Sequence, residues 1–144
     1  MNASLVAGLR FEFEYKIPET KTVPHLYPES EEFRLMPEVL ATGFMVGLIE
    51  WACIRFINEY IDWPNEQTVG TDVKLTHSAP TPPGFTVTVK GELVKVDQRK
   101  LTFAVKADDG VDTISEGTHE RRIINRAKFD SRANNKKLDR RTTE

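Results

Sequence analysis

The feature that most constrains the fold of this chain is an apolar segment at residues 43–57, interrupted only by Glu50 and Arg55. The segment contains no proline, and its pattern predicts one long helix from Thr42 to about Ile61, with Thr42 as the N-cap. A helix that is apolar nearly all round is expected to be buried nearly all round. The run is too short, and too often broken by charge, to cross a bilayer. We therefore expect this helix to form the centre of a globular core, with no membrane association.

Strand-like segments lie on both sides of this helix. Residues 10–16 alternate aromatic and charged side chains, which is the period-two pattern of a half-buried strand. After the helix come four β-rich segments, separated by turn residues: 68–79, 85–96, 100–107 and 111–124. This order predicts an antiparallel sheet wrapped around one central helix, an α+β architecture.

The chain length of 144 residues fits one domain, which we place at residues 1–129. Residues 128–144 carry six basic and three acidic side chains, and Leu138 is the one large apolar residue after Phe129. A segment of this composition buries too little apolar surface to offset its ordering entropy. We therefore predict that residues 130–144 form a disordered basic tail.

Charge and cysteine usage exclude several classes of protein. The net charge of −2 gives no reason to expect nucleic acid as a partner. Cys53 is the only cysteine, so no disulfide framework or multi-cysteine zinc site is possible, and a reducing, cytoplasmic location is expected. The segment 1–10 lacks the pattern of a signal peptide. The three histidines do not have metal-ligand spacing, so no metal site is predicted.

Glu50 is the most informative residue in the sequence. On a helix its neighbours three and four positions away are all apolar or glycine, and a carboxylate in such a place is costly unless it is paired or used. Arg55 lies at about 140° of rotation from Glu50 and points elsewhere. The pattern leaves two interpretations open: a catalytic base or nucleophile, and a structural carboxylate bonded to a distant strand.

His77 and Thr42 are further candidates. His77 shares the parity of Val69, Val73 and Leu75, so we expect it on the inward face of a strand, either as a core histidine or facing Glu50. Thr42 either caps the helix or stands where free helix amides could hold an oxyanion. Thr42 and Glu50 are about 12 Å apart along one helix, so direct contact within a chain is not expected.

Arg121 and Arg122 lie near the end of the last predicted strand. They could meet phosphates or simply form a solvated strand end, and the sequence pattern alone favours the second interpretation. His119, two residues earlier, gives no clear signal of function.

Five further stretches of the sequence are informative when they are taken together: His25–Ser30, Ala41–Cys53, Thr76–His77 with Ala79–Gly84, Asp109–Asp112 and Gly117–Arg121. They cover most of the chain from about Lys21 to Phe129. With these stretches, the sequence resembles the fluoroacetyl-CoA thioesterase family of the hotdog-fold superfamily.

The resemblance implies a hotdog fold, in which one long helix is wrapped by an antiparallel sheet, and a homodimer with active sites at the dimer interface. It implies that the catalytic residues are Thr42, Glu50 and His77. The substrate-binding residues that it implies are Phe33, Met36, Gly43, Gly70 and Arg121, the last placed to meet coenzyme A. Where the fluoroacetyl-specific member has a second phenylalanine, this chain has Met36, a flexible thioether.

The expected function is hydrolysis of a short, fluoroacetyl-CoA-like thioester to the free acid and coenzyme A. No separate cofactor is expected, because coenzyme A is part of the substrate. The alternative is a non-catalytic acyl-CoA-binding hotdog dimer that acts as a sensor or buffer. A hotdog dehydratase is a weaker alternative, because its expected Asp and His arrangement is absent.

Overall fold

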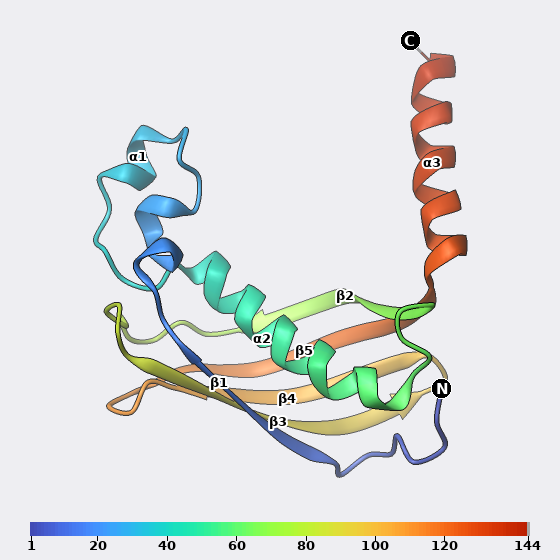
Figure 1. The fold of residues 1–144 in the computed structure, drawn as a ribbon, viewed down its shortest axis with the longest axis horizontal. Helices are drawn as coiled ribbons and strands as arrows, with labels where there is room; N and C mark the ends of the chain where they lie inside the picture. Colours follow the sequence, from blue (N-terminus) through green and yellow to red (C-terminus); the bar gives the residue numbers. More distant parts are fainter. Residues whose placement is uncertain (144) are drawn as a thin grey trace.

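The computed structural model describes the backbone of residues 1–143 and the side chains of residues 1–140. Within this range the strands form one antiparallel sheet in the order β1-β3-β4-β5-β2, and helix α2 lies across one face of it (Figure 1). The strands are β1 (Arg10–Lys16), β2 (Glu66–Leu75), β3 (Thr86–Asp97), β4 (Lys100–Asp108) and β5 (Thr113–Asn125). The helices and 3-10 turns are η1 (Glu19–Lys21), η2 (Val23–His25), α1 (Glu31–Arg34), α2 (Thr42–Ile57), η3 (Asn58–Tyr60) and α3 (Arg126–Thr143).

The predicted order of one strand, one long helix and four strands is confirmed. The bounds of β1 agree with the sequence pattern, and alternate residues of β1 are exposed. The expected strand at 68–79 instead runs from Glu66 to Leu75, so His77 lies two residues beyond its end. The fold is therefore α+β, with a single helix packed against an antiparallel sheet.

Helix α2 is buried along one face only, which corrects the expectation of burial on all sides. The buried side packs against the sheet, while Trp51 is 44% exposed and both Gly43 and Gly47 are exposed. The residues of the buried face are Met45, Leu48, Ile49, Ala52, Cys53 and Ile57. The apolar surface left on the other sides of α2 is not covered by the described part of this chain.

The start of α2 also differs from the prediction. Ala41 occupies the N-cap position, and Thr42 is the first helical residue. The Thr42 hydroxyl does not cap the helix, because it is bonded to another side chain. After Ile57 the chain tightens into the 3-10 turn η3, which ends at Tyr60.

The segment predicted as a disordered tail forms helix α3, which projects from the end of the sheet (Figure 1). All of its described side chains, residues 126–140, are exposed, so burial does not explain it. Local interactions do: Asn125 accepts a hydrogen bond from the Lys128 amide, and Arg126 pairs with Asp130 one turn later. The segment also lacks proline and glycine, the two residues least compatible with a helix.

The segment between β1 and α2 lies beyond the N-terminal end of α2 (Figure 1). It contains η1, η2 and α1, and Ser30 caps α1 by accepting a hydrogen bond from the Phe33 amide. An isolated bridge between Thr22 and Leu40 ties the base of this segment to the start of the helix.

Among the described residues, no helix is both long enough and apolar enough to span a membrane.

Replacement of Gly91 by alanine tests the packing of β1 on β3. Phe11 lies opposite Gly91 and stacks on Phe56, and an added Cβ at position 91 would overlap the Phe11 ring. We expect Gly91→Ala to lower the free energy of unfolding by about 1–3 kcal/mol, measured by urea denaturation.

The matched control is Gly47→Ala, whose added Cβ has no atom within 4 Å. We expect this variant to be as stable as the wild type or up to about 1 kcal/mol more stable, because alanine favours a helix. Equal stability of both variants would contradict the packing described for Phe11.

Candidate active site

Glu50 has no polar partner on its own helix and pairs instead with a residue of β5. Its Oε2 accepts a hydrogen bond from Nη1 of Arg121 at 2.9 Å. The Glu50 side chain is 37% exposed, whereas that of Arg121 is only 3% exposed. The carboxylate is therefore partly exposed, with its counter-charge buried beneath it. Its Oε1 has no hydrogen-bond partner among the described residues.

Arg121 is held on every side by acceptors. Its Nε donates to Oγ1 of Thr68 at 2.8 Å, and its Nη2 donates to the Thr68 carbonyl at 2.9 Å. Its Nη1 also donates to Nε2 of His119 at 3.1 Å. A guanidinium fixed by four acceptors has one orientation, and that orientation fixes Glu50.

His119 completes this buried network. It is 1% exposed, and its Nδ1 donates to the carbonyl of Asp72 at 2.8 Å. This bond leaves the lone pair on Nε2, where Arg121 donates. Burial, assisted by the nearby positive charge of Arg121, lowers the pKa of His119, so the ring is neutral at pH 7. A protonated His119 would have no acceptor to offer Arg121.

Gly70 makes room for the ion pair. A Cβ at this position would lie 2.9 Å from Glu50 Oε2, 3.3 Å from His119 Cε1 and 3.4 Å from Arg121 Nη1. The strand pairing also shifts register between Gly70 and Asp72, which is a β-bulge. The bulge places Gly70 on the inward face, and it explains why Val69 does not share the parity of Val73 as the sequence pattern suggested.

Thr42 and His77 form a second cluster at the N-terminal end of α2. Oγ1 of Thr42 and Nδ1 of His77 are 2.7 Å apart. The segment that carries His77 is held to β5 by hydrogen bonds from the Thr76 and Ser78 amides. Burial lowers the pKa of His77, and Nε2 has no hydrogen-bond partner within the described residues. A neutral imidazole with one unused nitrogen can give or take a proton.

The three predicted catalytic residues do not all meet within one chain. The structure joins Thr42 with His77 and joins Glu50 with Arg121. Thr42 and Glu50 are eight residues apart on α2, about 12 Å along the helix axis. Each chain therefore carries two separate halves of the predicted site.

The predicted substrate-binding residues have different surroundings. Phe33 stacks on Tyr27, with ring centroids 5.7 Å apart, and Met36 is 49% exposed. Gly43 lies against Leu26, where an added Cβ would stand 3.1 Å from Cδ1. These three residues therefore lie on, or against, the segment beyond the N-terminal end of α2.

Arg121 is placed differently from the prediction. The resemblance implies a contact with coenzyme A, but the guanidinium is buried and fully engaged by Glu50, Thr68 and His119. It is not a solvated strand end either. From its position under Glu50 it fixes the orientation of that carboxylate.

The roles of His119 and Thr68 were not identified from the sequence. Both point inward, and His119 and Arg121 share the parity of the buried Ile123 on β5. Period-two reading of β5 would have found them, because a histidine and an arginine on a core-facing parity require partners.

Other reactive groups are excluded by their surroundings. Burial raises the pKa of Cys53 to about 12, so its thiol is not a nucleophile at neutral pH. Among the described residues, no group of three or more His, Cys, Asp or Glu side chains has the geometry of a metal site.

Comparisons with known proteins identify the family of this chain. The model of the family described as fluoroacetyl-CoA-specific thioesterase matches residues 19–127. The fluoroacetyl-CoA thioesterase of Streptantibioticus cattleyicolor is 51% identical over 136 residues, which cover 94% of this chain and 97% of that protein.

Solved structures show the same fold. A mutant of a fluoroacetyl-CoA-specific thioesterase in complex with fluoroacetate and CoA has a TM-score of 0.84 and 54% identity, covering 87% of this chain and 99% of that chain. A hot-dog-like protein from Thermanaerovibrio acidaminovorans has a TM-score of 0.75 at 18% identity, covering 90% of this chain and 91% of that chain.

Loss of Arg121 tests the buried network. We expect Arg121→Met to lower the free energy of unfolding by about 3 kcal/mol, because buried acceptors lose their donor and Glu50 loses its counter-charge. Urea denaturation followed by tryptophan fluorescence would measure it.

The matched control is Arg122→Met, one residue further along β5, where the side chain is exposed. We expect a change within about 0.5 kcal/mol for this variant. Similar losses for the two arginines would contradict the special position of Arg121.

Proposed function

The chain belongs to the fluoroacetyl-CoA-specific thioesterase family, and from this we propose that its two polar clusters together hydrolyse the thioester. It is an acyl-CoA thioesterase that converts a short acyl-CoA to the free acid and coenzyme A. The observation that supports the catalytic assignment best is the half-exposed Glu50 carboxylate held over the buried guanidinium of Arg121.

We assign Glu50 as the group that starts the reaction. Arg121 holds Oε2, so Oε1 is the oxygen directed toward substrate. In one route Oε1 takes a proton from water, and the resulting hydroxide attacks the thioester carbonyl and expels the coenzyme A thiolate. In the other route Oε1 itself attacks the carbonyl and expels the thiolate, and water then hydrolyses the acyl–Glu50 anhydride to the free acid. The fixed guanidinium balances the negative charge and prevents the carboxylate from rotating away.

Thr42 and His77 act on the oxygen and sulfur of the thioester. The Thr42 hydroxyl and the free amides at the start of α2 stabilise the oxyanion that develops on the carbonyl. With the lone pair on Nε2, neutral His77 orients the water. With the proton on Nε2, His77 gives that proton to the departing thiolate and takes up the one that Glu50 removed from water. Coenzyme A thiolate is a good leaving group, so a strong general acid is not required.

We propose that a homodimer brings the two clusters together. Thr42 and His77 of one chain would face Glu50 of the other, since about 12 Å of helix separates these residues within a chain. Two features support this arrangement: α2 leaves apolar surface uncovered, and β2 is an edge strand of the sheet. Both features would be covered by a second copy.

Phe33, Met36 and Gly43 would line the acyl end of the site. They lie on or against the segment beyond the N-terminal end of α2, which is the end of the helix that carries Thr42. The exposed thioether of Met36 is more flexible than an aromatic ring, so it sets how far a fluorinated acyl group is preferred. Coenzyme A enters with the substrate, and no other cofactor is proposed. The unpaired, buried Cys53 supports a reducing compartment such as the cytoplasm.

Release of free thiol from acetyl-, fluoroacetyl-, propionyl- and a medium-chain acyl-CoA tests the function. We expect turnover of the short substrates, and a loss of about 100-fold or more in kcat for Glu50→Gln, because the amide is neither base nor nucleophile. Glu59→Gln, an exposed carboxylate near the end of the same helical segment, serves as the matched control.

Near wild-type turnover by Glu50→Gln would remove Glu50 from the mechanism. Saturable binding of acyl-CoA with no thiol release from any substrate would instead indicate the non-catalytic binding dimer.

A further inference from the structure

A basic groove lies at the end of the sheet where β5 passes into α3. Its volume is about 480 Å³, within the range of small-molecule sites. Four cationic side chains line it, together with one carboxylate and one aromatic ring. These six residues are Glu66, Arg99, Arg122, Lys128, Phe129 and Arg132.

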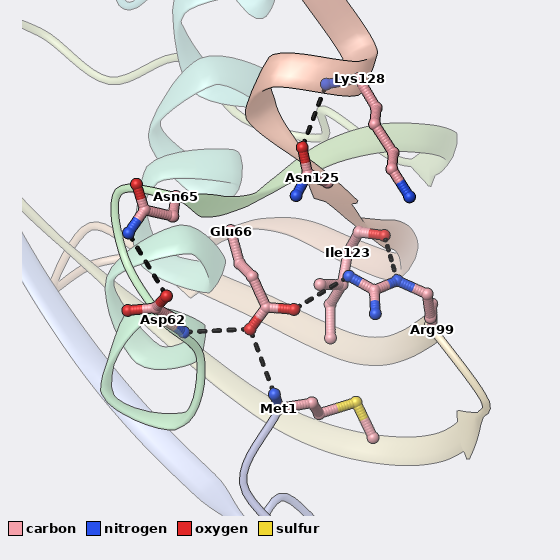
Figure 2. Close-up of polar contacts among 8 residues, drawn as sticks. All are labelled: Met1, Asp62, Asn65, Glu66, Arg99, Ile123, Asn125 and Lys128. Carbon is pink, nitrogen blue, oxygen red and sulfur yellow. Dashed lines mark hydrogen bonds and ion pairs between the residues drawn. The ribbon is translucent and has the colours of Figure 1, made fainter.

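The single carboxylate in this groove is already neutralised. Glu66 Oε1 accepts from the α-amino group of Met1 at 3.1 Å and from the Asp62 amide at 3.1 Å, while Oε2 accepts from Arg99 at 2.9 Å (Figure 2). The pKa of Glu66 is lowered to about 2, first by the hydrogen bond from the Asp62 backbone amide and then by the Met1 amine and Arg99. The negative charge of Glu66 is therefore already balanced by cationic partners.

The other cations lack such partners. Within the described part of the chain, no ion pair is formed by Arg122, Lys128 or Arg132. The Lys128 side chain extends from α3 toward the end of β5, on the side where Arg99 lies (Figure 2). Like charges placed around one groove repel each other unless an anion lies between them. Arginine and lysine together are typical of phosphate recognition.

The aromatic ring adds a second kind of contact. Phe129 is 38% exposed on a helix whose other described side chains are almost all polar. An exposed ring beside a cationic groove offers a surface on which a nucleobase can stack. Leu138 is nine residues further along and on the opposite side of α3, so the helix has no continuous apolar stripe for a protein partner.

We propose that this groove binds the phosphorylated adenosine end of coenzyme A, with its phosphates on Arg122, Lys128 and Arg132 and its adenine against Phe129. The inference rests on the proposed function, because it assigns the far end of the same substrate. Arg121 and Arg122, at adjacent positions on β5, then have different roles. Arg121 faces inward under Glu50, and Arg122 faces the groove. The pantetheine arm would connect the groove to a catalytic site.

Substrate truncation separates this role from a structural one. The test variant combines Arg122→Gln, Lys128→Gln and Arg132→Gln, and the control combines Lys136→Gln and Lys137→Gln, further along the same helix. For acetyl-CoA we expect at least a tenfold rise in KM of the test variant, with kcat within twofold and no change in the control. For S-acetylpantetheine, which lacks the nucleotide, we expect the same KM in all three proteins.

An unchanged KM for acetyl-CoA would overturn the proposal. So would an equal rise for acetyl-CoA and S-acetylpantetheine, since the groove would then act through the fold and not through the phosphates.

A binding measurement keeps this proposal separate from catalysis. Titration calorimetry with adenosine 3′,5′-bisphosphate is expected to show saturable binding to the wild type and the control, and a loss of at least tenfold in the test variant. No binding to the wild type would overturn the groove assignment, as would equally tight binding of a short DNA duplex. If the protein bound the bisphosphate but hydrolysed no thioester, the proposed function would be overturned and the assignment of the groove as a nucleotide-binding site would stand.

Discussion

The site depends on the ion pair between Glu50 and Arg121. A carboxylate on the apolar face of a core helix loses favourable hydration free energy, and the guanidinium buried beneath it offsets that loss. Several other features exist to hold that guanidinium: Thr68 accepts twice, neutral His119 accepts once, and Gly70 leaves the space that the pair occupies. The bulge after Gly70 turns the correct residues of β2 inward. The result is a carboxylate whose position is fixed while one of its oxygens remains open.

In the proposed homodimer, helix α2 distributes the chemistry over two chains. Its N-terminal end brings Thr42 to His77, and two turns later its middle presents Glu50. A rigid helix cannot bring these positions together, so the length of α2 makes a shared site the simplest way to combine them. The same helix leaves apolar surface uncovered, and the edge strand β2 offers unpaired backbone groups. Catalysis and assembly would then have one cause, which is the placement of polar residues along one apolar helix.

Local patterns predicted the elements, and long-range pairing decided the rest. The alternation in β1, the apolar run of α2 and the isolation of Glu50 are visible in the sequence, because each depends on neighbouring residues. The partner of Glu50 was not visible, because Arg121 is 71 residues away and meets it only through the sheet. The sequence pattern placed Val69 on the same face of the strand as Val73. This was wrong because the bulge at Gly70 inserts one residue, which moves every later side chain to the other face. Helix α3 was missed because composition reports the lack of burial and not the local pairs, such as Arg126 with Asp130, that stabilise it.

Complementation between two inactive variants tests the shared site most directly. His77→Ala and Glu50→Gln proteins would be purified separately, unfolded together in urea, refolded as a mixture and assayed for thiol release. A mixed dimer contains one site with both substitutions and one site with neither, so the account predicts that activity returns well above that of either variant refolded alone. If Glu50 worked with His77 of its own chain, every site would carry a defect. A mixture as inactive as its components, with mixed dimers demonstrated by mass spectrometry, would contradict the account.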